Sequence, residues 1–289
     1  MCIRDRQIVG KCNRVVNESM PIVDARLENG ARVNAVVYPV ALNGPILTIR
    51  RFPDTPVTME RLISLGSLPK TCAEFLASLV KARYSMIIGG GTGSGKTTFL
   101  GALSQYIPKD ERLITIEDNA ELKIQGIANL VRLEAKAANR EGGSEVTIRD
   151  LIRSALRMRP DRIIVGEVRG GETVDMLQAL NTGHEGSLST AHANSSRDML
   201  SRLETMTLMG VELPLEAIRR QIASGVDILI HLGRMRDKSR KVLEITEVCG
   251  FEEGEIKTNV LYQWKEGEGL IKLANLLNRE KLERAGIVL

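Results

Sequence analysis

A glycine-rich run, Gly90-Gly-Thr-Gly-Ser-Gly-Lys-Thr-Thr98, directly follows the apolar residues 85–88 and narrows the possible folds more than any other stretch of the sequence. It fits the pattern G-x-x-x-x-G-K-[ST]. Its glycines allow the backbone N–H groups to turn inward as a nest for an anion. Residues 97–104 continue in a helical pattern, so the positive end of that helix dipole points at the same anion. The run predicts a strand, a phosphate-binding loop and a helix.

Such a loop is typical of nucleotide sites. Lys96 can reach the β- and γ-phosphates, and the Thr97 hydroxyl can ligate Mg²⁺. The alternative, a glycine-rich turn with a chance lysine, is disfavoured by the strand before the loop and the helix after it. The residues predicted to contact the nucleotide are Gly90, Gly91, Thr92, Gly93, Ser94, Gly95, Lys96, Thr97 and Thr98.

The composition limits what such a site can serve. With 289 residues, 43% of them hydrophobic, the chain can form one large domain or two unequal ones. The net charge of +4 comes from interspersed acids and bases, and only 3% of residues are aromatic. Neither feature is by itself typical of a nucleic-acid-binding surface. The four cysteines form no C-x-x-C pair, so we interpret them as free thiols in a reducing compartment.

The sequence contains no signal peptide and no predicted membrane span. The uncharged run 33–49 holds asparagines, prolines and a glycine, which suit strand–turn–strand. Residues 1–6 carry no usable pattern, and we expect that sequence upstream has been lost.

Residues 1–52 predict a small N-terminal α/β domain. A hairpin is expected from strands over 22–27 and 31–37 joined at an Asn-Gly turn, and Arg26 and Arg32 flank that turn. These arginines could equally be solvated strand charges. The other expected elements are a helix or strand over 8–16, a strand over 45–49 and a proline-marked linker over 53–60.

Residues 61–289 predict one α/β domain. Helical periodicity over 59–66 and 72–83 is followed by apolar runs that alternate with helical patterns, which predicts a mainly parallel sheet wrapped by helices. The last residues, 270–289, are rich in leucine and charge and predict an amphipathic helix. The strands are expected over 85–88, 112–117, 129–133, 162–166, 187–191 and 227–232.

Two of these strands end in acids. The run 112–117 ends in Glu117 and Asp118, and the run 162–166 is followed by Glu167. Ligands of parallel sheets bind outside the carboxyl ends of the strands, so these carboxylates are placed to orient water or support Mg²⁺. The alternatives are an acidic surface turn and a buried strand with a chance acid.

Histidines bracket the strand 187–191. His192, at its carboxyl end, is a candidate sensor of the γ-phosphate, while a structural role is the alternative for both His184 and His192. A zinc site is disfavoured because no cysteine is near. His231 is interpreted as structural.

Two further patterns remain open. Arg149, Arg153 and Arg157 recur at helical spacing, which fits a solvated face, an interface or a track for a polyanion. The second pattern is an apolar stripe at helical spacing, which predicts side chains buried in the hydrophobic core: Met199, Leu203, Met206 and Met209. Ser195 or Ser196 is expected to cap this helix.

The order of the motifs resembles the type II/type IV secretion ATPase superfamily. The phosphate loop, T-I-E-D, M-R-P-D-R-I-I-V-G-E-V-R-G and N-T-G-H-E-G-S-L-S-T-A-H-A-N resemble its Walker A, Asp box, Walker B and His box. The sequences of these motifs are most similar to those of the CpaF-like branch, which powers Tad/Flp pili. Residues 21–34, 47–52 and 282–289 also resemble that branch, so the resemblance covers nearly the whole chain.

The resemblance implies a RecA-like P-loop ATPase domain that uses ATP and Mg²⁺. It implies that Glu117 activates water, that Glu167 supports Mg²⁺ or that water, that Asp118 lies at the nucleotide, and that His192 senses the γ-phosphate. Arginines of the small domain or linker would clamp phosphate when the domains close. The candidates for this clamp are Arg26, Arg32, Arg50 and Arg51.

The function expected from the resemblance is ATP hydrolysis that drives a pilus or secretion machine. The working form would be a homo-hexameric ring at the cytoplasmic face of the inner membrane, associated with it through integral platform proteins and without direct nucleic-acid binding. Members of this branch usually carry a helical segment upstream of the small domain, and from the resemblance we expect the given sequence to begin at or just inside that domain. A RecA-like nucleic-acid translocase or helicase is the alternative, supported by the arginine face and basic charge and opposed by the low aromatic content.

Overall fold

The computed structural model describes residue 10 and the ranges 15–28, 30–51, 55–136 and 144–288. The chain forms two compact units, Met1–Thr55 and Pro56–Leu289, which are described separately. The helix or strand expected over 8–16 lies mostly outside the described residues. In the described ranges, no helix combines the length and apolarity needed to span a membrane.

The small unit is built on a three-stranded antiparallel sheet in the order β1-β2-β3. Strand β1 (Ile22–Arg26) pairs with β2 (Arg32–Val36), which confirms the predicted hairpin, and β3 (Ile46–Arg50) pairs with β2 on its other side. Alternate residues of β2 point into a small core because side chains on a strand face opposite sides in turn. That core consists of Val16, Ala35 and Val37, with Val23 and Leu47 packed against it.

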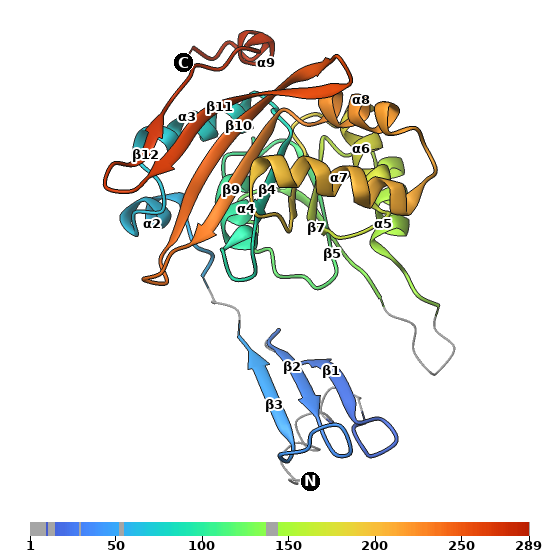
Figure 1. Ribbon diagram of the computed structural model, residues 1–289. Coiled ribbons are helices and arrows are strands. Elements are labelled where there is room, and N and C mark those ends of the chain that lie inside the picture. The colour runs from blue at the N-terminus through green and yellow to red at the C-terminus, as the bar shows by residue number, and fades with distance from the viewer. Residues whose placement is uncertain (1–9, 11–14, 29, 52–54, 137–143, 289) are drawn as a thin grey trace. The chain divides into compact units, whose positions relative to one another are not determined.

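The large unit contains a nine-stranded mixed sheet in the order β12-β11-β10-β9-β4-β8-β7-β5-β6 (Figure 1). Every strand predicted from the sequence is present, and these six run parallel to one another. They are β4 (Met86–Gly90), β5 (Arg112–Glu117), β6 (Asn129–Glu134), β7 (Arg162–Val168), β8 (Leu188–Ala191) and β9 (Ile228–Arg234).

Three antiparallel strands extend the sheet beyond β9 and were not predicted. They are β10 (Arg240–Glu252), β11 (Glu255–Lys265) and β12 (Gly269–Lys272). The helix expected over 270–289 is therefore wrong: Leu270 pairs with Trp264 in the sheet, and only the short α9 (Glu280–Arg284) is helical. The leucines at 270, 273, 276 and 277 recur at helical spacing, but the pairing of residues 269–272 with β11 places the first of them in a strand.

Helices cover both faces of the large sheet. On one face lie α2 (Met59–Ser64), α3 (Lys70–Lys81) and α4 (Lys96–Ser104); on the other lie α5 (Ile148–Ala155), α6 (Thr173–Asn181), α7 (Ser196–Gly210) and α8 (Leu215–Gly225) (Figure 1). In β4, Met86 and Ile88 join the first core and Ile87 the second. The central strands are thus buried on both faces, as their continuous apolar runs indicated.

Two helical patterns differ in detail from expectation. Arg157 lies in a short 3-10 helix (Leu156–Met158) after α5 has ended, so it does not continue the face of Arg149 and Arg153. On α7, Ser195 is the N-cap as predicted, but Met209 is exposed at the helix end and leaves the buried stripe.

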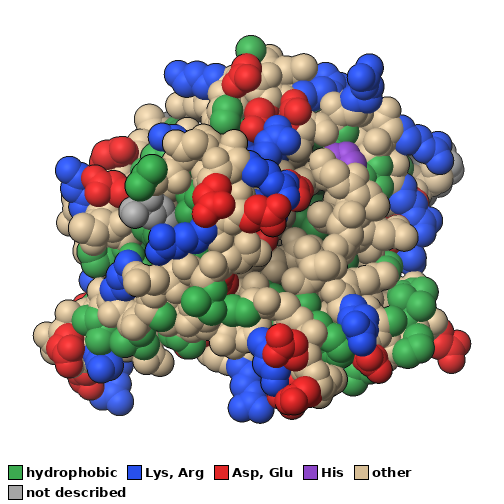
Figure 2. Space-filling model, turned by 90° about the horizontal axis from the view of Figure 1, so that it is seen from above, with side chains coloured by type: hydrophobic (Ala, Val, Ile, Leu, Met, Phe, Trp, Pro, Cys, Tyr) green, Lys and Arg blue, Asp and Glu red, His purple; other side chains and the backbone are tan. Residues whose placement is uncertain are grey.

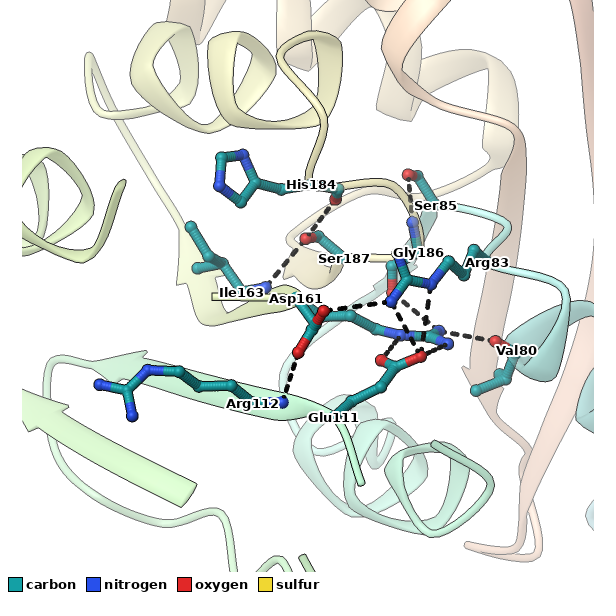
Figure 3. Close-up of polar contacts among 11 residues, drawn as sticks. Val80, Arg83, Ser85, Glu111, Arg112, Asp161, Ile163, His184, Gly186 and Ser187 are labelled. Carbon is teal, nitrogen blue, oxygen red and sulfur yellow. Dashed lines mark hydrogen bonds and ion pairs between the residues drawn. The ribbon is translucent and has the colours of Figure 1, made fainter. Parts of the chain in front are cut away.

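A polar network ties together the strands at the amino end of the parallel sheet (Figure 3). Arg162 at the start of β7 is fully buried, and its Nε and Nη2 donate to the two oxygens of Glu111 at 2.5 and 3.0 Å. Its Nη1 donates to the carbonyl of Val80 at 2.6 Å. Asp161 accepts the N–H of Arg112 at 2.7 Å, and Arg83 contacts both Glu111 and Asp161.

Candidate functional site

The glycine-rich loop joins β4 to α4 at the carboxyl end of the parallel strands. Gly95 caps α4 with φ +95°, a left-handed conformation that L-residues rarely adopt. A Cβ at Gly90 would lie 2.4 Å from Ser94 Oγ and 2.6 Å from the carbonyl of Leu232, so the loop leaves no room for a side chain there. Gly91 and Gly93 face open space. The loop has the shape of an anion nest in front of a helix N-terminus.

Lys96 is the cation of this loop. Its side chain is buried, and its Nζ donates to the carbonyl of Gly90 at 3.1 Å. Nζ also lies 3.4 Å from Glu167 Oε1 and 3.4 Å from His192 Nδ1. Burial lowers the pKa of Lys96, and the charge of Glu167 opposes that shift. The three predicted residues from β7, β8 and the loop therefore meet at one point.

Glu167 is the common partner of three positive or hydrogen-bonding groups. Its Oε1 faces Lys96 and His192, while its Oε2 accepts from Nε and Nη2 of Arg169 at 2.6 and 2.5 Å. Burial alone would raise the pKa of Glu167, but the Arg169 hydrogen bond and the Lys96 charge lower it overall. Glu167 is therefore held as a carboxylate.

His192 follows β8 and connects Lys96 to Glu167. Its Nε2 lies 3.2 Å from Glu167 Oε1. Burial and the nearby Lys96 charge lower the pKa of His192, so the ring is neutral at pH 7. In the matching tautomer, Nε2–H donates to the carboxylate and Nδ1 accepts from the ammonium, and this polarity fits the contacts on both sides.

Glu117 ends β5 and is held differently from Glu167. Its Oε2 accepts the backbone N–H groups of Glu121 and Leu122 at 2.8 and 2.9 Å. Its Oε1 is buried and has no hydrogen-bond partner among the described residues. Burial raises the pKa of Glu117, and the two backbone N–H groups oppose that shift. A Cβ at Gly166 would lie 2.9 Å from Glu117 Cγ, so the ends of β5 and β7 are in close contact.

Asp118 is joined to the same cluster through Arg169, whose Nη1 lies 3.4 Å from Asp118 Oδ2. Thr97 and Thr98 are the second and third residues of α4, half-buried and exposed respectively. One end of the sheet thus carries the loop, Glu117 at the end of β5 with Asp118 after it, Glu167 of β7 and His192.

The four candidate arginines belong to the small unit. Arg26 pairs in register with Arg32, and Arg32 with Arg50, so three arginines stand side by side across β1, β2 and β3. Directly opposed residues of neighbouring strands share one face of a sheet. Arg51 follows β3 and is exposed.

Other sequence candidates have structural partners. The ring of His184 contacts the carbonyl of Ala179. Arg149 and Arg153 both bind the buried carboxylate of Asp175 on α6, at 2.7 and 2.8 Å, so two of the three arginines whose spacing left a solvated face, an interface or a polyanion track open have an internal partner. Figure 2 shows basic and acidic side chains interspersed over the face it displays, rather than gathered by charge.

Sequence reasoning missed two arginines near the loop. Arg169 lies two residues after Glu167, and its spacing from that acid could have indicated a partner on the same strand end. Arg240, at the start of β10, donates from Nε to the carbonyl of Gly93 at 2.9 Å. It is 147 positions away in the sequence, so no local pattern could have indicated this contact.

The residues present fit a nucleotide with Mg²⁺. The loop offers open backbone at Gly91 and Gly93, a buried ammonium at Lys96 and a buried hydroxyl, Ser94 Oγ, without a partner among the described residues. Carboxylate and hydroxyl oxygens are the ligands that Mg²⁺ prefers, together with phosphate oxygens. Thr97 and Glu167 supply such oxygens from the chain.

Comparison with known proteins gives consistent matches. Residues 4–266 match the family described as type II/IV secretion system protein. A candidate conjugal transfer protein of Mycobacterium tuberculosis is 40% identical over 260 residues, which cover 88% of this chain and 73% of that protein. The type IV secretion system protein VirB11 of Brucella abortus is 36% identical over 244 residues, covering 75% and 67%.

A solved structure extends the likeness to the fold. The VirB11 ATPase of the Brucella suis type IV secretion system, in complex with sulphate, superposes with a TM-score of 0.55 at 32% identity, covering 83% of this chain and 80% of that one. The mixed α/β architecture predicted from the sequence agrees with this neighbour.

Proposed function

The chain belongs to the family of type II/IV secretion system proteins, and from this we propose that its glycine-rich loop binds ATP with Mg²⁺ and hydrolyses it. The observation that carries the proposal is the meeting of Lys96 with Glu167 and His192 within 3.4 Å, beside an anion nest. A lysine, an acid and a histidine from three separate elements have no structural need to converge at the carboxyl edge of a sheet, where parallel sheets bind ligands.

The loop residues have distinct tasks in this proposal. The backbone N–H groups of residues 91–97 and the N-terminus of α4 hold the phosphates, and Lys96 donates to the β- and γ-phosphates. Thr97 and Glu167 hold the metal, which when bound neutralises the charge that develops on the transferred phosphoryl group. Lys96 and His192 would then exchange their contact with Glu167 for contacts with phosphate oxygens.

We assign the water-activating role to Glu117. A general base works best when its pKa lies nearer to the ambient pH, and burial raises the pKa of Glu117 while that of Glu167 is lowered. Glu117 also has an oxygen free of partners in the described part of the chain, whereas both oxygens of Glu167 are engaged. The two glutamates therefore divide base and metal duties.

His192 is proposed as the sensor of the γ-phosphate because it already bridges Lys96 and Glu167. Loss of the γ-phosphate would return it to those two partners. The arginines of the small unit, Arg26, Arg32, Arg50 and Arg51, are proposed to bind phosphate when the units close, since a guanidinium fork binds phosphate bidentately.

The machine served is proposed from the family. We infer a homo-hexameric ring that works at the cytoplasmic face of the inner membrane together with integral platform proteins. The resemblance of the motif sequences to the CpaF-like branch supports assembly of Tad/Flp pili. The relatives named for type IV secretion and conjugal transfer support a role in moving a macromolecule across or out of the membrane.

Turnover tests the assignment. Wild type is expected to hydrolyse ATP in the presence of Mg²⁺, while Lys96→Ala and Glu117→Gln lose turnover. Glu117→Gln should retain ATP binding, which separates the base from the phosphate contacts. Normal turnover in both variants would refute the site. Stimulation of turnover by DNA at moderate salt would instead favour the nucleic-acid translocase.

A further inference from the structure

The hairpin formed by β9 and β10 lies directly beside the glycine-rich loop. Strand β9 pairs in parallel with β4, with Leu232 in register with Gly90, and the Leu232 carbonyl closes off the space at that glycine. Strand β9 then continues to Arg234, and β10 returns with Arg240 paired to Arg234. The hairpin therefore extends past the edge of the sheet at which β4 gives way to the loop.

Arg240 reaches from this hairpin onto the loop. Its Nε donates to the carbonyl of Gly93 at 2.9 Å, and its Cδ lies 3.2 Å from the position that a Cβ would take at Gly95. The stem of the side chain thus crosses the second half of the loop. Any side chain at Gly95 would push Arg240 away, in addition to the strain of its positive φ.

The contact uses only part of the guanidinium. In the described residues, neither Nη1 nor Nη2 of Arg240 has a hydrogen bond or an acidic partner, and the side chain is exposed. The nearest acid in the hairpin sequence, Asp237, accepts the N–H of Ser239 at 2.9 Å. An arginine held at Nε keeps its terminal fork available, and that fork matches phosphate geometry.

We propose that Arg240 is a nucleotide-contacting residue supplied by the same chain, whose Nε holds the loop through Gly93 while Nη1 and Nη2 donate to phosphate oxygens of the bound nucleotide. This rests on the proposed binding of ATP by the loop. It adds a contact from an antiparallel hairpin to a site otherwise built from the parallel strands and α4.

The neighbouring residue offers a matched control. Lys241 is also a cation of β10 that binds a backbone carbonyl: its Nζ donates to Gly66 at 2.5 Å and lies over the Trp264 ring. It points to the turn between α2 and α3, away from the glycine-rich loop. Loss of a cation and a carbonyl contact at the same hairpin can therefore be compared with and without proximity to phosphate.

The experiment measures binding of ATP, ADP and AMP with Mg²⁺ to the full chain, for wild type, Arg240→Gln, Arg240→Lys and Lys241→Gln. Arg240→Gln is expected to weaken ATP and ADP binding by about 10-fold or more, since it removes charge-assisted hydrogen bonds. AMP binding should change least, Arg240→Lys should recover part of the loss, and Lys241→Gln should bind as wild type does.

Thermal unfolding of each variant checks that the fold is kept, and Arg240→Lys supplies a second reading if Arg240→Gln unfolds. Equal loss for ATP, ADP and AMP would leave Arg240 as a support of the loop alone and overturn the proposal, as would wild-type affinity in Arg240→Gln. If wild type itself binds neither ATP nor ADP, the proposed function fails instead.

Discussion

Both ends of the parallel sheet carry a cluster of charged side chains. The polar atoms of the amino-end cluster are paired, whereas some polar atoms at the carboxyl end have no partner among the described residues. At the amino end, Arg162 has each of its three nitrogens donating to an oxygen, and Glu111 accepts with both of its own. At the carboxyl end, Lys96 and His192 share one oxygen of Glu167 at 3.2–3.4 Å, and Ser94 Oγ and Glu117 Oε1 are buried without a partner among the described residues.

The difference shows how to separate a structural charge cluster from a binding site. A buried polar group left without a partner destabilises the fold, so it persists where a ligand completes it. The satisfied cluster should therefore be needed for stability, and the incomplete cluster for binding and turnover.

Arg162→Met should destabilise the fold by about 3–5 kcal/mol, because it leaves the buried Glu111 carboxylate without its bidentate partner. Chemical denaturation of wild type and variant measures the loss. The double variant Arg162→Met with Glu111→Met should recover much of it, since no buried charge is then unpaired. If Arg162→Met were as stable as wild type, the amino-end cluster would not be needed for the stability of the fold.

Lys96→Ala should reduce ATP turnover by about 10²–10³-fold, the usual effect of removing one preorganised donor to a reacting group. Its stability should stay close to that of wild type or rise, because the cost of burying the Lys96 ammonium disappears while Glu167 keeps its pair with Arg169. Steady-state hydrolysis and thermal unfolding are measured on the same preparation. A large loss of stability with unchanged turnover would mean that the carboxyl-end cluster is needed for the fold and not for binding and turnover.

The pH dependence of turnover should report on Glu117. A base acts as the carboxylate, so the rate is full above the pKa of Glu117 and falls as the pH drops through it. Because burial raises the pKa of Glu117, this acid limb should lie at a higher pH than for an ordinary glutamate. The residual rate of Glu117→Gln should lack the limb; the same limb in that variant would assign it to another group.

Lys281→Met should have the smallest effect on stability, and it tests a second ion pair at the amino end of the sheet, between Lys281 and Asp227. Lys281 Nζ donates at 2.7 Å to the half-buried Asp227, whose pKa is raised by desolvation while the charge of Lys281 opposes that shift. Without Lys281, Asp227 can take a proton, so the loss should be about 1–3 kcal/mol. This deficit should grow as the pH is raised from the acid range through the raised pKa of Asp227, because stability is lost as Asp227 must ionise. A deficit that does not vary over this range would contradict the assignment.

The sequence predicted what depends on local pattern. The loop at Gly90–Thr98 and the six parallel strands follow from continuous apolar runs and glycine spacing, and the acids at 117 and 167 followed from their places at strand ends. The strands β10 to β12 were missed because their apolar residues are broken by charges and bulges, as between Val242 and Glu244. Their pairing, rather than their composition, decides their structure.

The remaining features of the site depend on contacts between distant segments. Nothing in the sequence near Glu117 indicates that one of its oxygens would hold two backbone N–H groups while the other is left alone. The Arg240 contact with Gly93 likewise needs the β9–β10 hairpin to be placed first. Residue types and strand ends were predictable, but partners were not.

The place of β4 in the sheet also bears on how the chain is made. Its Met86 pairs with Leu188 on one side and Ile228 on the other, so both neighbours are synthesised long after it. Contacts so distant along the chain form slowly, since a large loop must close before they are made. Until the residues up to β9 have been synthesised, β4 lacks a neighbouring strand on one side, and the glycine-rich loop that follows β4 is not held in its final position. Nascent chains of this protein should therefore acquire nucleotide binding late in translation, after the hairpin that carries Arg240 has emerged.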